Sequence, residues 1–171
     1  RYANPVTQYA NDIKPGASRA TLTLANGTKI TLSESKAGVI IDSVNIRYKD
    51  GSSVQSTDEP GAEPQMLNAA TPRGGTYQVM LPDGTNIWLN AASEISFPSR
   101  FEGEERLVWL RGEAYFEVKK DARRRFVVES AGQRIEVLGT HFNVNSYADE
   151  SSVRTTLMEG SVAAATKEER I

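Results

Sequence analysis

The chain has 171 residues, of which 39% are hydrophobic and 25% are charged, and its 20 basic and 22 acidic residues give a formal net charge of −2. This length fits one domain or two small subdomains. The one basic cluster, residues 119–125, is predicted to be a solvated turn, and the sequence therefore predicts no nucleic-acid partner. The absence of cysteine excludes disulfides and thiolate metal sites. No apolar run reaches the about 20 residues that a membrane-spanning helix needs.

The first half of the chain is predicted to form short hairpins after an irregular lead-in at residues 1–15. Apolar and polar residues alternate from Ala20 to Leu32 around Asn26-Gly27, which is the strongest short-range signal for a hairpin with a type I′ turn. The unit from Leu24 to Leu32 recurs from Leu81 to Leu89, with Asp-Gly at its turn. This match predicts two hairpins with the same role in the fold. The alternative is that hairpins converge on Asn-Gly and Asp-Gly for steric reasons alone.

A polar stretch is predicted to divide the chain. Residues 44–54 form a third alternating run around Asp50-Gly51, and residues 52–67 are rich in Ser, Thr, Asp, Glu, Pro and Gly, which is typical of a loop. We therefore expect an N-terminal β-hairpin subdomain at residues 16–66 and a second β domain at residues 67–171.

The second half of the chain is predicted to consist of many short strands. Residues 113–118 alternate strictly, which places Ala114, Phe116 and Val118 on one face and Glu113, Tyr115 and Glu117 on the other. Arg111-Gly112 is predicted to be a kink or a turn. Because no convincing amphipathic helix is present, the sequence predicts an all-β fold. An antiparallel β-sandwich of jelly-roll type is the first expectation, and a solenoid-like stack of β-hairpins is the alternative.

The sequence predicts no catalytic, cofactor-binding or metal site, and the protein is expected not to be an enzyme. His141 is the single histidine, whereas general base catalysis and histidine metal sites need further partners. Its phase is opposite to that of Phe142 and Val144, so we expect it to face solvent or a polar neighbour.

The two tryptophans are predicted to pack inside the fold. Trp88 and Trp109 each lie within an apolar run, which favours core or inter-sheet packing. An alternative is a carbohydrate-binding face, for which the aromatic candidates are Trp88, Trp109, Tyr77, Tyr115 and Phe97.

Several ordered motifs resemble the periplasmic FecR domain of membrane-anchored anti-sigma factors. They are TPRGG, LPDG, WLN, GEAYFEV, VLGTHFNV and EGSV, in this order between residues 71 and 162. An ordered set is harder to match by chance than one short pattern. The resemblance implies structural or interface roles for Thr71, Pro72, Arg73, Gly74, Gly75, Leu81, Pro82, Asp83, Gly84, Trp88, Leu89, Asn90, Gly112, Glu113, Ala114, Tyr115, Phe116, Val118, Gly139, Thr140, Phe142, Asn143, Val144, Glu159 and Gly160.

The resemblance implies a signalling region rather than an enzyme, located in the periplasm as part of a single-pass inner-membrane protein. In that family a cytoplasmic region holds an extracytoplasmic-function sigma factor. The periplasmic part responds to the signalling domain of a TonB-dependent outer-membrane receptor, which a small C-terminal domain engages. We expect the cytoplasmic, transmembrane and C-terminal parts to lie outside this chain.

Two other functions stay open from the sequence, a periplasmic carbohydrate-binding module and a passive structural spacer. If the region docks with another β element, residues 153–163 are the expected edge, because unpaired strand edges are templates for pairing.

Overall fold

The computed structural model describes residues 17–43, 45–56 and 63–166, and every regular element in these residues is a β-strand. The predicted lead-in at residues 1–15 lies outside the described residues. In chain order the strands are β1 (Ala17–Ser18), β2 (Thr21–Thr23), β3 (Lys29–Thr31), β4 (Gly38–Ile41), β5 (Asn45–Tyr48), β6 (Ser53–Ser56), β7 (Met66–Ala70), β8 (Gly75–Met80), β9 (Asn86–Leu89), β10 (Glu94–Pro98), β11 (Glu105–Glu117), β12 (Arg125–Ser130), β13 (Gln133–Val137), β14 (His141–Ser146), β15 (Arg154–Glu159) and β16 (Ala163–Thr166).

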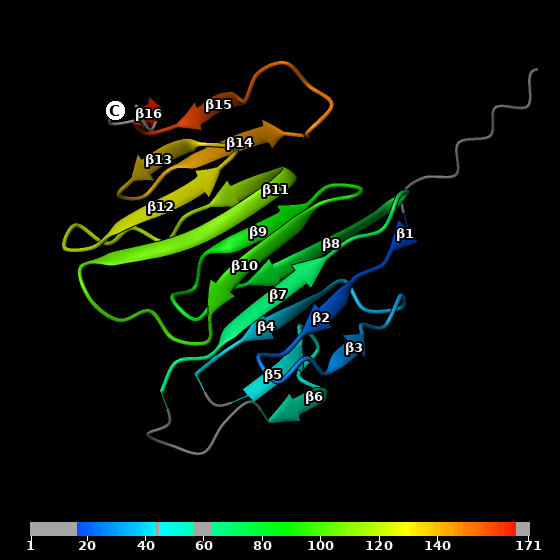
Figure 1. The fold of residues 1–171 in the computed structure, drawn as a ribbon. Helices are drawn as coiled ribbons and strands as arrows, with labels where there is room; N and C mark the ends of the chain where they lie inside the picture. The colour runs from blue at the N-terminus through cyan, green and yellow to red at the C-terminus, as the bar shows by residue number, and fades with distance from the viewer. Residues whose placement is uncertain (1–16, 44, 57–62, 167–171) are drawn as a thin grey trace, which may run out of the picture.

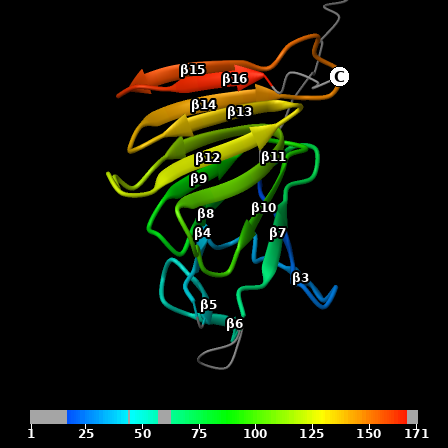
Figure 2. The same ribbon diagram turned by 60° about the vertical axis from the view of Figure 1, so that its left-hand side comes forward.

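The strands form one mixed sheet that curls over a single core (Figure 1). A first layer has the order β3-β2-β7-β10-β11-β12-β13-β16, and a second layer has the order β6-β5-β4-β8-β9-β11-β14-β15. Along the chain, segments of the first layer alternate with segments of the second layer, and most segments contain two strands. Successive pairs therefore stack along the roll, with β15 and β16 together at one end and β3, β5 and β6 at the other (Figure 2).

The long strand β11 joins the two layers. Its first half pairs with β10 and β12, and its second half, from Gly112, pairs with β14 and β9. Gly112 has a φ of +88°, a conformation that glycine adopts without the steric penalty of a Cβ atom. The predicted kink at Arg111-Gly112 is confirmed, and it lets one continuous strand belong to both layers.

The all-β prediction is confirmed, but the antiparallel arrangement is only partly right. The pairs β1/β8, β4/β8 and β11/β12 are parallel. Because β11 runs through both layers, the fold is one strongly curled sheet rather than two separate sheets. The division at residue 66 stays a prediction. Strands from its two sides pair directly, β2 with β7 and β4 with β8, and contribute to the same core.

Three hairpin loops share one conformation. The loops follow Leu24, Tyr48 and Leu81. The carbonyl of each of these residues accepts a hydrogen bond from the N–H of the glycine three positions later, and its N–H donates to the carbonyl of the residue after that glycine. Each glycine has a positive φ, whereas the preceding Asn or Asp does not. The type I′ prediction is therefore wrong. These are three-residue loops with a glycine bulge, further held by the Asn or Asp oxygen, which accepts the N–H two residues on.

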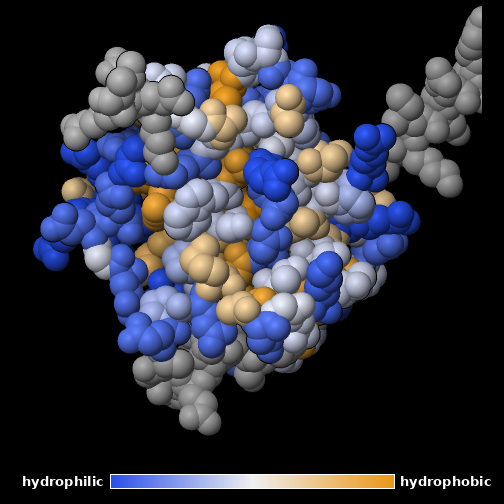
Figure 3. Space-filling model, in the orientation of Figure 1, coloured by the Kyte–Doolittle hydropathy of each residue, from blue (hydrophilic) through white to orange (hydrophobic). Residues whose placement is uncertain are grey.

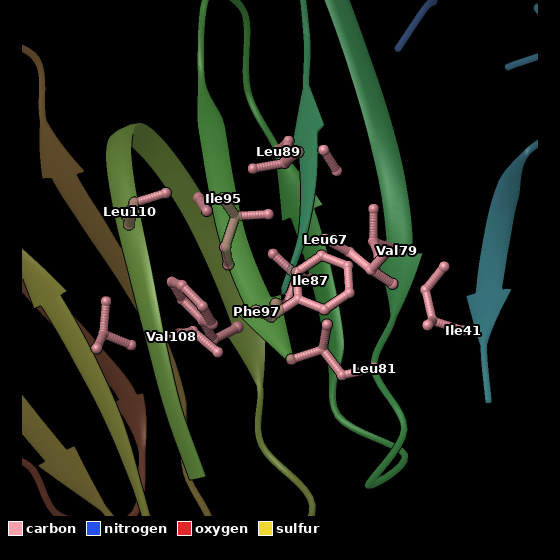
Figure 4. Packing of buried hydrophobic residues seen from close by; sticks show 14 of the residues in the cluster. Ile41, Leu67, Val79, Leu81, Ile87, Leu89, Ile95, Phe97, Val108 and Leu110 are labelled. Atoms are coloured by element: carbon pink, nitrogen blue, oxygen red, sulfur yellow. The ribbon is translucent and has the colours of Figure 1, made fainter. Parts of the chain in front are cut away.

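The core lies between the two layers and is built mainly from the inward-facing side chains of β2, β4, β5 and β7 to β14. Figure 4 shows Leu67 and Phe97 of the first layer among Val79 and Ile87 of the second. Near β14, the rings of Phe116 and Phe142 are stacked with centroids 5.0 Å apart. Burial of such side chains stabilises the fold by about 1.5–3 kcal/mol each.

Candidate functional site

The apolar motif residues belong to the core. Ala114, Phe116 and Val118 are buried while the residues between them are half-buried, which confirms the predicted faces of this strand. Leu81, Leu89, Phe142 and Val144 are also buried. These seven motif residues therefore stabilise the roll and are not available to a partner.

A buried arginine brings three of the motifs together. The side chains of Arg106 and Asp83 are only 1% and 6% exposed, and Arg106 Nη1 donates to Asp83 Oδ2 at 2.7 Å. The guanidinium also donates to the carbonyls of Lys119 at 2.7 Å, Arg124 at 2.9 Å and Leu138 at 3.3 Å. The LPDG turn, the end of GEAYFEV and the start of VLGTHFNV are thus fixed to one side chain.

A second polar cluster fixes the TPRGG motif to the bend of β11. Thr71 Oγ1 donates to the carbonyl of Asn90 at 2.5 Å and accepts the N–H of Ser93 at 3.1 Å. Ser93 Oγ in turn accepts the N–H of Glu113 at 2.9 Å. A groove of about 470 Å³ lies against this cluster, and the left-handed residues Ala92, Gly112 and Ala131 are among its lining residues.

The glycines of the last two motifs allow close approach between segments. A Cβ atom on Gly139 would lie 2.7 Å from Lys120 Cα, and one on Gly160 would lie 2.9 Å from Thr140 Oγ1. Thr140 Oγ1 also donates to the carbonyl of Ser161 at 3.1 Å. These contacts tie EGSV to VLGTHFNV at the β15 end of the roll.

The glycines of the first two motifs lie at turns, where the backbone conformation or a close contact favours glycine. Gly74 and Gly84 have φ values of +72° and +88°, and a Cβ atom on Gly75 would lie 2.8 Å from Pro72 Cδ. Pro82 is half-buried in the LPDG loop, whereas Arg73 is exposed.

Two edge strands, β15 and β16, form one end of the roll. Among the described residues β15 pairs only with β14, and β16 pairs only with β13. Leu157 and Met158 on β15 are 44% and 66% exposed, and Glu159 is exposed on the same strand. Thr155 Oγ1 is buried there without a hydrogen-bond partner in the described part of the chain. This edge coincides with the predicted docking edge at residues 153–163.

The comparisons with known proteins agree with the motif pattern. The profile of the family described as FecR protein matches residues 68–163, which is more than half of the chain. The chain belongs to the FecR family. No curated protein matches it.

Two solved structures resemble this FecR chain. Both are described as a proposed anti-sigma factor from Parabacteroides distasonis ATCC 8503, at 2.50 and 1.65 Å resolution. They are 33% and 34% identical to this chain, with TM-scores of 0.59 and 0.58, over 60% and 59% of its length. The matched part spans 48% of each of those chains, about half of their length.

The prediction that both tryptophans pack in the core or between sheets is wrong. Trp88 alternates with the buried Ile87 and Leu89 and therefore points outward from the second layer, where it is half-buried. Trp109 points outward from the first layer and is 40% exposed. The tryptophans thus lie on opposite sides of the FecR roll. With Tyr77 and Phe97 buried, the five aromatic candidates do not form one carbohydrate-binding face.

His141 faces outward as predicted, with Nδ1 at 3.5 Å from Glu159 Oε2.

Among the described residues, no group of three or more His, Cys, Asp and Glu side chains has the arrangement of a metal site. The described residues also contain no helix with the length and apolar character that a membrane span requires. Figure 3 shows apolar residues on one face of the molecule bordered by hydrophilic ones.

The sequence reasoning missed Arg106 and Ser93, which organise the two polar clusters. One signal was available for Arg106. It has the same phase as Val108 and Leu110 on a strand, and an arginine at an inward position needs buried partners. Ser93 has no such signal, because its role depends on the approach of Thr71 and Gly112 from elsewhere in the chain.

An ion cluster on the outer face of the first layer leads to a pH prediction. Glu136 accepts hydrogen bonds from Arg134 Nε and Arg125 Nη1, both at 2.8 Å. These bonds, that from Arg134 first, hold the pKa of Glu136 below its ordinary 4.5. A lowered pKa in the folded state contributes stability above the unfolded pKa, and this stability is lost as the pH falls through the folded pKa.

We expect Glu136→Gln to lower the free energy of unfolding at pH 7 by about 0.5–1 kcal/mol, the range for a partly exposed ion pair. The difference from the wild type should shrink as the pH falls below the ordinary pKa of 4.5 toward the lowered pKa of the folded state, where the wild-type carboxylate also becomes neutral. Thermal unfolding at pH 7, 5 and 3 measures this. Glu104→Gln, an exposed position in the loop before β11, is the control and should change little. A difference independent of pH would contradict the prediction.

Proposed function

We propose that this chain is the periplasmic signalling region of a membrane-anchored anti-sigma factor. In this proposal it relays the state of a TonB-dependent outer-membrane receptor to an extracytoplasmic-function sigma factor. The observation that carries the proposal is the FecR match over residues 68–163, and the similarity to a proposed anti-sigma factor supports it. The motif residues support a conformational role, because many of them hold the roll together through buried contacts.

The experiment that tests the relay is binding of purified signalling domains from the TonB-dependent receptors of the source organism. Isothermal titration calorimetry would compare this chain with the full-length periplasmic region. We expect one receptor domain to bind the full-length region. If this chain binds equally well, the contact lies within residues 1–171. The absence of binding by every receptor domain to either form would overturn the proposal.

Within the chain, we place the contact surface at the β15 edge. The strand has no partner on one side in the described residues and exposes Leu157 and Met158. In this proposal an extended segment of the partner pairs with the edge as an added strand. Such pairing adds main-chain hydrogen bonds, which gives affinity with little dependence on the edge side chains.

Proline substitution separates main-chain pairing from side-chain contact. Successive N–H groups of an edge strand alternate between its partner and solvent, so one of Thr155→Pro and Thr156→Pro removes only a solvent-facing donor. We expect the variant that keeps the wild-type melting temperature to weaken receptor-domain binding at least tenfold, whereas Met158→Ala should weaken it much less. Wild-type affinity in that folded proline variant would exclude the β15 edge.

A further inference from the structure

The outer face of the second layer carries a row of aromatic and amide side chains. Gln78, Trp88, Tyr115 and Asn143 lie directly opposite one another on the adjacent strands β8, β9, β11 and β14. All four point away from the core, because their neighbours along each strand are buried. The rings of Trp88 and Tyr115 have centroids 5.5 Å apart and planes inclined by 49°. Two aromatic rings therefore lie side by side at the middle of a polar sheet face.

The polar groups beside these rings are held in place by one another. Glu113 accepts one hydrogen bond from Asn90 Nδ2 and one from Asn143 Nδ2, both at 2.8 Å. On the other side of the rings, Gln78 donates to Asn86 at 3.1 Å and accepts from Lys49 Nζ at 2.7 Å. Such pairing reduces the side-chain freedom that a ligand would have to remove on binding. It also leaves unused hydrogen-bonding capacity, since a carboxylate has about four acceptor positions and an amide has two donors and an acceptor oxygen.

The chemistry of this face matches a neutral sugar better than a charged ligand or a protein. A pyranose ring presents C–H groups on its faces, which pack on aromatic rings, and hydroxyl groups at its edge, which bond to amides and carboxylates. Glu113 and Glu117 both face outward here, and they would repel an anionic ligand. The cores of protein interfaces are depleted of charged residues, whereas here Glu113 lies next to the aromatic pair.

We propose that the face around Trp88 and Tyr115 is a binding site for a neutral oligosaccharide. The ligand lies across the strands along the row from Gln78 to Asn143, with sugar rings packed on Trp88 and Tyr115 and hydroxyl groups bonded to Glu113 and Asn143. This site is distinct from the β15 edge and does not depend on the signalling function proposed above.

Tryptophan fluorescence gives a direct test, because the chain has two tryptophans on opposite sides of the roll. In a Trp109→Phe variant the emission comes from Trp88 alone. We would titrate it with cellohexaose, mannohexaose and maltohexaose, and with hexagalacturonate as the anionic comparison. We expect at least one neutral hexasaccharide to change the emission saturably, with a Kd of about 1 mM or below, and hexagalacturonate to leave it unchanged.

Variants then locate the site. Calorimetry in the wild-type background should show that Trp88→Ala abolishes binding and that Tyr115→Ala and Asn143→Ala each weaken it at least tenfold. Ser96→Ala is the matched control, since Ser96 lies opposite Trp109 on the outer face of the first layer and should not change the affinity. The melting temperature of each variant shows that it is folded.

Two results would overturn the proposal. One is the absence of a saturable response to all three neutral hexasaccharides at 10 mM, on the order of ten times the 1 mM affinity scale. The other is loss of receptor-domain binding in Trp88→Ala without sugar binding by the wild type, which would assign the face to a protein partner.

Discussion

Replacement of Arg106 by methionine is expected to lower the free energy of unfolding by about 3–5 kcal/mol, the range for removing one partner of a buried ion pair. Methionine fills much of the arginine volume, so the loss comes from polar groups rather than from a cavity. Asp83 would keep a buried charge without its counterion, and the carbonyls of Lys119 and Arg124 would lose their side-chain donor, whereas the carbonyl of Leu138 keeps the N–H of Asp121. Each buried acceptor left unpaired adds about 1–3 kcal/mol of desolvation penalty.

Urea unfolding at pH 7 measures the loss of stability. Two further variants, one in the same cluster and one on the surface, serve as comparisons. Asp83→Asn should cost less than Arg106→Met, because the guanidinium keeps its three carbonyl partners. Arg111→Ala is the matched control. Its guanidinium is 85% exposed and lies 4.0 Å from Glu94, so the change should stay within about 0.5 kcal/mol. A loss of less than about 1 kcal/mol in Arg106→Met would mean that the cluster does not hold the three motifs together.

Local sequence patterns predicted the strands well, since each strand depends on its own alternation. Residues 113–118 alternate over a full strand, and Asn or Asp followed by Gly marks three hairpin loops that the structure contains. The sequence pattern did not determine the conformation of those loops. Asn-Gly fits a type I′ turn and a glycine-bulge loop equally well, and the number of loop residues between paired positions decides between them.

Layer membership and orientation depend on contacts between distant residues, and there the sequence was insufficient. Trp88 lies between two apolar residues, but strict alternation puts it outside because Ile87 and Leu89 are inside. A locally apolar run hides this phase. The parallel pairing of β11 with β12 was equally hidden, because local alternation is the same in parallel and antiparallel strands. The candidate site was predicted as motif residues without roles, and only their three-dimensional placement separates buried supports such as Thr71 from outward residues such as Asn143.

Substitution of Gly112 by alanine is expected to destabilise the protein by about 3 kcal/mol or more, because two effects add there. The φ of +88° places an L-residue in a strained conformation, at about 1–2 kcal/mol. The added Cβ would also lie 2.5 Å from Ser93 Oγ and 2.9 Å from Ser93 Cα. The second contact is with backbone, so a change of rotamer does not relieve it. Ser93 would have to move and lose its hydrogen bond with the N–H of Glu113.

Gly27→Ala separates the two effects, because Gly27 has nearly the same φ, +86°, and nothing lies within 4 Å of its ideal Cβ position. It should lose only the conformational part, about 1–2 kcal/mol. Urea unfolding of both variants therefore measures the close contact at the bend of β11 as the difference between two losses. If the close contact holds the bend, Gly112→Ala should also broaden the amide resonances of both halves of β11. Equal losses in the two variants would show that the bend tolerates a side chain, and that the strand joins the layers without help from Ser93.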